Sequence, residues 1–292
     1  MTDEADEPTR RILRQLEDPS RTRRTEEFGA WVAGATDIGR RHHTNQDAFA
    51  IGVPDPEARR AVLVVSDGVS SSVGAERASA TASSTLRDFL VDNLDLDTAE
   101  LSEQLTTGYK LANDAVLADG EDGSSVGSCT LVAAVVRDHE VHLANIGDTR
   151  AYWVPDRGEA VQLSVDDSMA QAQMEMGLSR EEAESSYHAH AITKWLGPEA
   201  PTVAPRVGSA TLEEAGWVLI CSDGLWTYAS SAEAMGRLVG QFQRSMPPSD
   251  GPGVLAAALV AWANHQGGRD NITVAMARVD PPAPDVASLL DD

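Results

Sequence analysis

The 292-residue chain has no run of 18 consecutive apolar residues, so the sequence predicts no membrane-spanning helix. Its first ten residues, MTDEADEPTR, are acidic and lack the apolar stretch of a secretory signal peptide, which predicts a protein that is not exported. Hydrophobic residues still make up 42% of the composition, enough for the core of one large domain or two small ones. We therefore expect a globular cytoplasmic protein without a membrane partner.

Cysteine and basic residues are scarce. The two cysteines, Cys129 and Cys221, lie in apolar, strand-like runs, which is typical of packing residues in a reduced protein and not of a disulfide framework. Lys and Arg number 23 against 46 Asp and Glu, for a formal net charge of −23, and no basic block follows the first 24 residues. A nucleic-acid partner is therefore not expected, whereas metal cations or basic partners suit this balance.

The two ends of the chain differ from its middle. Residues 1–27 are charged and poor in large apolar groups; Ile12, Leu13 and Leu16 have the spacing of one short helix, but we expect a flexible arm. Residues 281–292 are acidic and broken by proline, which predicts a tail. Neither an internal repeat nor a low-complexity linker interrupts residues 28–280, so one domain is expected there.

Apolar patterns in the middle of the chain predict both strands and helices. The expected strands cover residues 61–66, 130–136, 141–146, 151–154, 217–222 and 272–278. The expected helices cover residues 74–93, 98–118 and 252–265. A short turn at 137–140 joins two of the strands, which is typical of a hairpin and therefore of antiparallel pairing. We expect an α+β fold in which helices cover an antiparallel sheet core.

Aspartates recur where the predicted strands begin or end. Asp67 and Asp223 each follow a buried strand and precede a glycine, and Asp47, Asp148 and Asp270 lie at other strand ends. Acids gathered at one sheet edge are costly unless cations neutralise them, and carboxylate oxygens with a backbone carbonyl suit Mg²⁺ or Mn²⁺. The alternative is that each Asp-Gly pair merely forms a turn.

Eight motifs, in this order, resemble those of the metal-dependent (PPM, type-2C) serine/threonine protein phosphatases of bacterial type. They are TDIGRRHHTNQDAF, VVSDGVSSSVGAERAS, SCTLVAAVV, HLANIGDTRAYW, QLSVDDS, AITKWLG, LICSDGLW and GGRDNITVAMARV. The resemblance covers roughly residues 30–279. It implies a sandwich of two antiparallel β-sheets flanked by helices.

The resemblance also implies roles for the aspartates. The residue matching Asp67 bridges two metal ions, and the one matching Gly68 offers its carbonyl to one of them. Those matching Asp223 and Asp270 complete the first metal's ligands, and the one matching Asp148 serves a third, looser site. With Mn²⁺ or Mg²⁺ bound, the family hydrolyses phosphoserine and phosphothreonine in proteins by a bridging water, without a phosphoenzyme.

The sequence departs from the family pattern beside these acids. Gln46 stands where the family has glutamate, next to Asp47, so we expect a weaker second metal site that needs more free Mn²⁺. The family's phosphate-gripping arginine falls at His42, directly after Arg40 and Arg41. We expect His42 to bind the phosphate, or one of the two arginines to take its place.

Two other segments bear on the site. Animal and plant members have a histidine, often assigned as general acid, at the position of Val69; this chain lacks that histidine, as bacterial members do. Residues 164–196, here called the flap segment, lie where the family has a mobile flap beside the active site. Within it, His188 and His190 have no accompanying ligand motif, so no zinc site is expected.

The function expected from these features is a protein serine/threonine phosphatase that opposes a kinase. A binding module that has lost activity is an alternative suggested by Gln46 and His42. Retention of the clustered aspartates argues against it, because an abandoned metal site has no physical reason to keep them. A small-molecule phosphomonoesterase is a further alternative that the sequence leaves open.

Overall fold

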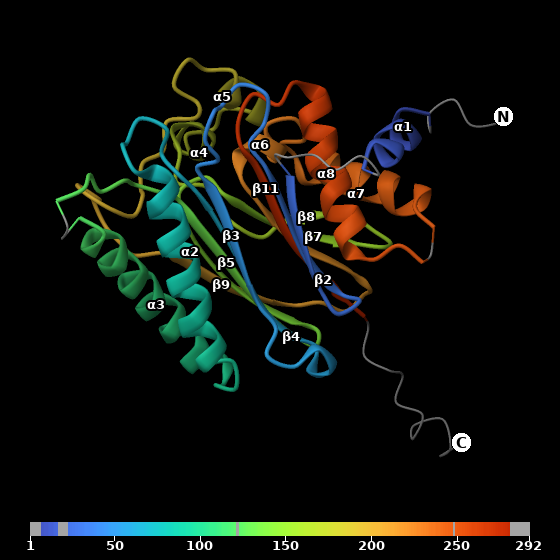
Figure 1. The fold of residues 1–292 in the computed structure, drawn as a ribbon, viewed down its shortest axis with the longest axis horizontal. Coiled ribbons are helices and arrows are strands. Elements are labelled where there is room, and N and C mark those ends of the chain that lie inside the picture. The colour runs from blue at the N-terminus through green and yellow to red at the C-terminus, as the bar shows by residue number, and fades with distance from the viewer. Residues whose placement is uncertain (1–6, 17–22, 121–122, 248, 281–292) are drawn as a thin grey trace.

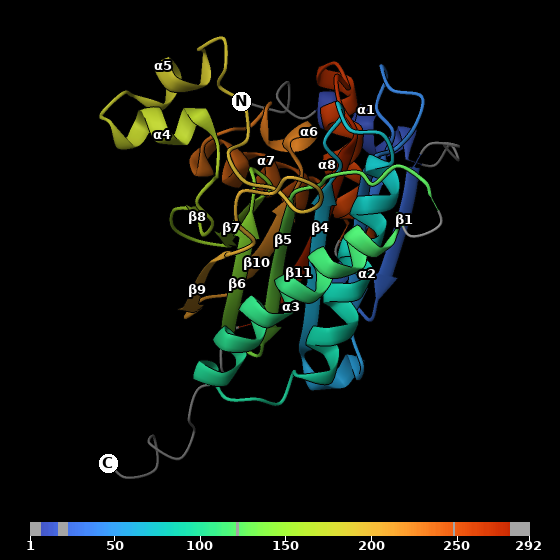
Figure 2. The same ribbon diagram turned by 90° about the vertical axis from the view of Figure 1, so that its left-hand side faces the viewer.

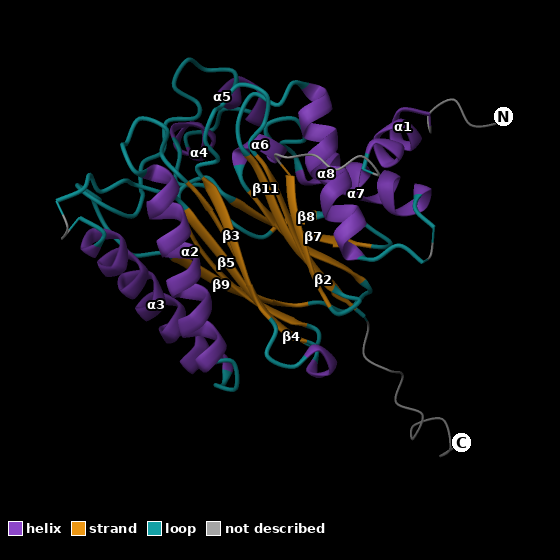
Figure 3. Ribbon diagram, viewed as in Figure 1, coloured by secondary structure: helices purple, strands orange, loops and turns teal. Residues whose placement is uncertain are grey.

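The computed structural model describes residues 7–16, 23–120, 123–247 and 249–280. Within these ranges two antiparallel β-sheets pack face to face, and helices cover the outer face of each sheet (Figures 1 and 3). The predicted α+β sandwich is therefore confirmed.

The larger sheet has six strands in the order β1-β2-β11-β10-β7-β8, and the smaller has five in the order β3-β4-β5-β6-β9. All neighbouring strands among these are antiparallel. The larger sheet contains β1 Arg23–Phe28, β2 Val32–Asp37, β7 Arg150–Pro155, β8 Val161–Gln162, β10 Gly216–Cys221 and β11 Ile272–Val279. The smaller contains β3 Asp47–Gly52, β4 Arg60–Asp67, β5 Leu131–Arg137, β6 Glu140–Ile146 and β9 Arg206–Thr211.

Helices surround the sandwich on both sides. The smaller sheet is covered by α2 (Ala75–Asp92) and α3 (Thr98–Ala118), and the larger by α7 (Ala232–Ser245) and α8 (Pro252–Gln266) (Figure 1). Figure 2 shows α4 (Met169–Glu175) and α5 (Arg180–Glu184) projecting beyond one end of the strands. The short elements are α6 (Asp223–Trp226) and a 3₁₀ turn, η2 (Pro56–Ala58). No described helix is both long and apolar enough to cross a bilayer.

The central strands are continuously apolar because both of their faces are buried. In β5, Val132 and Val136 belong to the core between the two sheets, whereas Leu131 and Val135 belong to the core beneath α2 and α3. Successive side chains of a strand point to opposite faces, so a strand between two apolar layers needs apolar residues at every position. The carboxylates that end such strands therefore mark the limit of the core.

All six predicted strands and all three predicted helices are present, and no boundary differs from the prediction by more than one residue. The hairpin over 137–140 is confirmed by pairing of Arg137 with Glu140. The sequence reasoning missed β2 and β3, of six residues each, the two-residue β8, and β9, whose side chains alternate between half-buried and exposed. It also missed α7, whose apolar face packs on the larger sheet.

The prediction of a flexible arm over residues 1–27 is wrong for the described part of that range. Glu7–Gln15 forms the helix α1, and Ile12 on it is buried in the core beneath α7 and α8. β1 pairs with β2 from Arg23 opposite Asp37 to Phe28 opposite Val32. Ile12, Leu13 and Leu16 pack against the core and so hold α1 on the domain. The polar strand β1 is held by backbone pairing with β2 at the edge of the sheet. The predicted tail, 281–292, lies outside the described residues.

Replacing Ile12 by alanine is expected to lower the free energy of unfolding by about 2–4 kcal/mol, the usual cost of removing a buried isoleucine side chain. Ile12 is 3% exposed, whereas its neighbour Arg11 is exposed, so Arg11→Ala serves as the control and should change stability little. Urea unfolding measures both. Equal midpoints for Ile12→Ala and the wild type would show that α1 does not contribute to the folded domain.

Candidate metal centre

Five aspartates from both sheets meet at one end of the sandwich. In the smaller sheet Asp67 ends β4 and lies directly opposite Asp47, the first residue of β3. In the larger sheet Asp223 follows β10 and Asp270 precedes β11, and Asp148 lies in the turn between β6 and β7. Each strand alternates direction in an antiparallel sandwich, so strand starts and strand ends share one edge. The fold thus brings together all the acids that the sequence singled out.

The acids enclose a small cavity of about 140 Å³. Asp67, Asp148, Asp223 and Asp270 line it together with Gly68 and, from the flap segment, His190 and Ile192. Neither Lys nor Arg is among its described lining residues. An adjoining cavity of about 290 Å³ shares His190, Asp223 and Asp270 and adds Arg269 and Tyr228. We call the smaller one the acid cavity.

Burial and mutual repulsion disfavour ionisation of these carboxyl groups. Burial raises the pKa of Asp47 to about 7, in spite of its hydrogen bond from Ser222. Burial, followed by repulsion from Asp166, raises the pKa of Asp148 to about 7. For Asp67 and Asp223, burial comes first and the neighbouring aspartates second, and both raise the pKa well above its ordinary value. A bound cation would reverse this balance.

Hydroxyl groups hold Asp47 across the interface between the sheets. Ser222 Oγ donates to Asp47 Oδ2 at 2.7 Å and accepts from the Thr273 backbone N–H at 2.9 Å. Thr273 Oγ1 also lies 2.6 Å from Thr36 Oγ1. The sequence reasoning missed these residues. The available signal was a hydroxyl side chain in or beside a buried strand, since a buried polar group must find a partner.

Asn271 holds the loop that carries the predicted phosphate ligands. Its Nδ2 donates to the carbonyls of Ile38 at 2.8 Å and Thr44 at 3.2 Å, and its Oδ1 accepts from the Gln46 N–H at 2.7 Å. One amide side chain thus fixes both ends of the loop beside Asp270. Asn271 was also missed, although it is part of the quoted motif GGRDNITV.

Gly68 is required by close approach of the backbone. Its N–H donates to the Gln46 carbonyl at 3.0 Å, and a Cβ atom would lie 2.7 Å from that carbonyl oxygen and 2.8 Å from the Ala75 carbonyl oxygen. The hydrogen bonds described for Gln46 are made by its backbone. The effect of its side chain on the Mn²⁺ requirement stays a prediction.

The predicted phosphate-binding residues take different positions. His42 reaches the site: its Nε2 lies 3.2 Å from Asp270 Oδ1. Arg40 and Arg41 are exposed, and neither lines the acid cavity or the adjoining one. Arg269, which sequence reasoning did not single out, lines the adjoining cavity. His42 thus contacts an acid of the site, and binding of phosphate by His42 or by either arginine stays a prediction.

Replacing His42 by alanine is expected to raise the KM for a phosphopeptide about tenfold, the scale of one lost charge-assisted contact. His43→Ala is the control, because His43 is exposed. A KM that is unchanged by His42→Ala but raised by Arg40→Ala or Arg41→Ala would assign phosphate binding to an arginine instead. Initial-rate kinetics at a fixed Mn²⁺ concentration separate the two results.

The donor set fits a hard divalent cation. Asp47 Oδ1 and Asp223 Oδ1 are buried without a hydrogen-bond partner, and the cavity offers carboxylate and carbonyl oxygens, as Mg²⁺ and Mn²⁺ prefer. Among the described residues no three His, Cys, Asp or Glu side chains are already arranged around a single metal position. Such ions usually complete their coordination with water.

Comparison with known proteins places this site in a family. The protein phosphatase 2C family model matches residues 36–263. Protein phosphatase PhpP of Streptococcus pneumoniae is 30% identical over 250 residues, which are 84% of this chain and 96% of that protein. The chain belongs to the protein phosphatase 2C family, and its enzyme class is that of the protein serine/threonine phosphatases.

Solved structures agree with this assignment. Serine/threonine phosphatase Stp1 from Staphylococcus aureus has the same fold, with a TM-score of 0.74 and 24% identity over 88% of this chain and 98% of that one. The catalytic domain of serine threonine protein phosphatase PstP, in complex with two manganese ions, aligns with a TM-score of 0.63 and 25% identity, covering 89% and 99%. The predicted family and fold are confirmed.

Proposed function

We propose that the chain hydrolyses phosphoserine and phosphothreonine esters of proteins at the acid cavity. Asp67, the Gly68 carbonyl, Asp223 and Asp270 would hold two Mn²⁺ or Mg²⁺ ions, and Asp148 would serve a third. The observation that carries this proposal is the convergence of these acids on one cavity that no described Lys or Arg lines. Divalent ions bound there would lower the pKa of a water molecule and offset the charge of the phosphoryl oxygens.

The side chains of this protein would position the metal ions and the substrate, and neither cysteine would act as the nucleophile. Cys129 pairs with Gly68 through an isolated backbone bridge, but its side chain belongs to the core beneath α2 and α3 and does not line the acid cavity. Burial also raises the pKa of the Cys129 thiol to about 12 and raises that of Cys221 still further above its ordinary value. Thiolates are therefore too scarce at neutral pH to attack phosphorus. This supports direct hydrolysis by water, without a phosphoenzyme.

Substrate binding would use the groups at the mouth of the cavity. His42, held at Asp270, and Arg269, in the adjoining cavity, are positioned to meet a phosphate or an acidic side chain near it. We further propose that the substrates are cytoplasmic phosphoproteins, and that a serine/threonine kinase forms them, since an enzyme of this class consumes what such a kinase makes. The family relationship supports this proposal.

Parallel assays on phosphoserine and phosphothreonine peptides, a sugar phosphate and p-nitrophenyl phosphate, each with MnCl₂ or EDTA, test the function. We expect hydrolysis of the peptides in MnCl₂, slower hydrolysis of the sugar phosphate, and no turnover in EDTA. A sugar phosphate hydrolysed faster than either peptide would identify a small-molecule phosphomonoesterase. Binding of the peptides without hydrolysis would identify a binding module.

A further inference from the structure

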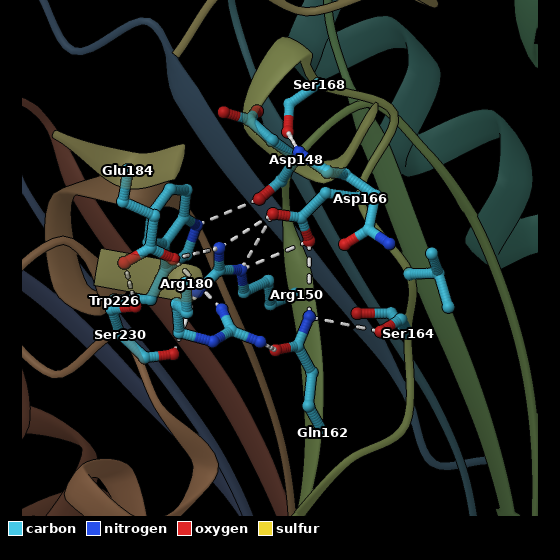
Figure 4. Close-up of polar contacts among 12 residues, drawn as sticks. Asp148, Arg150, Gln162, Ser164, Asp166, Ser168, Arg180, Glu184, Trp226 and Ser230 are labelled. Carbon is cyan, nitrogen blue, oxygen red and sulfur yellow. Dashed lines mark hydrogen bonds and ion pairs between the residues drawn. The ribbon is translucent and has the colours of Figure 1, made fainter. Parts of the chain in front are cut away.

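Arg150, the first residue of β7, is 1% exposed. Its Nε donates to both carboxylate oxygens of Asp166, at 3.1 and 3.0 Å, and its Nη2 donates to Asp166 Oδ2 at 2.7 Å and to Glu184 Oε1 at 3.3 Å. Its Nη1 donates to the Ser230 carbonyl at 2.9 Å. One buried cation thus joins two carboxylates and a backbone carbonyl (Figure 4).

The partners of Arg150 come from separate parts of the chain. Asp166 and Glu184 belong to the flap segment, residues 164–196, whereas Ser230 follows α6. Glu184, at the end of α5, also accepts from Arg180 at 2.9 Å and from the Ser230 hydroxyl. Removing such charges from water is costly, and an apolar cluster of the same volume is often equally stable. The network links the flap segment to the residues that follow α6.

Trp226 connects this network to the acid cavity. The guanidinium carbon of Arg150 lies 3.6 Å from the centre of the Trp226 ring, within the range of a cation–π contact. Trp226 Nε1 donates to the Asp148 carbonyl at 2.8 Å, and Trp226 ends the short helix that Asp223 begins. The ring of His190 lies 5.8 Å from the same indole. Arg150 therefore contacts the flap segment directly and is linked to Asp148 through Trp226.

We propose that Arg150 is a positioning residue for hydrolysis: it fixes the flap segment and Trp226 to each other. It thereby fixes the positions of His190 and Ile192, which form one wall of the acid cavity. The inference rests on the proposed function. A small phosphate ester needs only the acids and their cations, whereas a phosphoprotein must also fit the wall. Loosening the wall will therefore impair binding of a phosphopeptide more than binding of a small ester.

The test compares Arg150→Lys with a matched control, Arg278→Lys. Lysine keeps the charge but lacks the two-pronged donor geometry of arginine. Arg278 makes a comparable arrangement at the opposite end of the larger sheet: its guanidinium binds both oxygens of Asp156 at 2.7 and 2.5 Å and lies 5.4 Å from the Trp217 ring. A loss that is specific to Arg150 is thus separable from the general cost of weakening an Arg–Asp–Trp contact.

For Arg150→Lys we expect the KM for a phosphopeptide to rise about tenfold or more, because small misplacements of binding groups carry large kinetic costs. The KM for p-nitrophenyl phosphate should change much less, and Arg278→Lys should change neither. Native-state cleavage by chymotrypsin after Tyr187, an exposed residue of the flap segment, should become faster in Arg150→Lys alone. Equal KM ratios and equal cleavage rates in the two variants would overturn the proposal.

Glu184→Gln keeps the proposal testable if Arg150→Lys does not fold. This change leaves the Arg150–Asp166 pair intact and weakens the link to α5, so smaller effects of the same direction are expected. A wild type that hydrolyses neither substrate would refute the proposed function, yet the chymotrypsin rates would still decide whether Arg150 holds the flap segment. Unchanged cleavage in Glu184→Gln, with an unchanged KM, would count against the proposal.

Discussion

Replacing Asp67 by asparagine is expected to abolish phosphatase activity and, at the same time, to raise the melting temperature of the metal-free protein at pH 8. The activity loss should exceed roughly 100-fold, because even the hydrogen-bond partners of metal ligands typically contribute 10- to 100-fold. The gain in stability follows because Asp67 is buried among Asp47, Asp223 and Asp148, whose charges oppose its own. Rates in MnCl₂ and thermal melts in EDTA measure the two effects.

Asp156→Asn is the matched control for this experiment. Asp156 lies at the opposite end of the larger sheet, and its hydrogen bond with Arg278 lowers its pKa, so its charge stabilises the fold. Asparagine there should lower the melting temperature and leave activity unchanged. An Asp67→Asn variant that keeps its activity, or that melts below the wild type in EDTA as Asp156→Asn does, would contradict the assignment of Asp67 to a metal site.

Mn²⁺ is expected to stabilise the wild type, and to do so more at pH 8 than at pH 5.5. The pKa values of Asp47 and Asp148 are raised from 3.8 to about 7, so these groups bind protons more tightly when folded. Their contribution to stability is complete below pH 3.8 and is lost as the pH rises toward 7. Metal-free protein should therefore melt at a lower temperature at pH 8 than at pH 5.5. Mn²⁺ should bind more tightly at pH 8, because it no longer competes with protons for the carboxylates.

Differential scanning calorimetry at both pH values, with EDTA or MnCl₂, measures this effect. The Mn²⁺-induced rise in melting temperature should be larger at pH 8 by at least about 3 °C, which corresponds to roughly 1 kcal/mol for a domain of this size. The Asp67→Asn variant should lose most of the Mn²⁺ response. An equal Mn²⁺ effect at the two pH values, or a higher melting temperature in EDTA at pH 8, would show that the acids do not repel one another as inferred.

The sequence predicted those features whose cause is local. The continuously apolar run 131–136 predicts a strand, and the structure shows why it is apolar throughout: both faces of this strand are buried. An aspartate directly after such a run, as at Asp67, predicts a metal ligand when several strands end in this way, because turn formation alone does not require an aspartate at each of them. These two patterns predicted an antiparallel sheet core and the acids at its strand ends, and the family resemblance added the two-sheet sandwich.

The missed features depend on residues that are distant in sequence. The polar strand β1 reads as a charged arm, since its pairing with β2 and the docking of Ile12 beside α8 are not visible locally. The pairing of Arg150 with Asp166 was not predicted, although both lie in quoted motifs, because a sequence does not distinguish an exposed arginine from one that is 1% exposed. The same holds for Ser222, whose partner Asp47 lies 175 residues away.

Anomalous X-ray diffraction from crystals grown with MnCl₂ tests the central claim most directly, because it locates manganese without an assay. We predict two strong anomalous peaks in the acid cavity, both against the Asp67 carboxylate, one of them also against the Gly68 carbonyl and the other against Asp223 and Asp270. A weaker third peak is predicted against Asp148. Crystals that show no manganese in the acid cavity, under conditions in which the enzyme is active, would contradict the account.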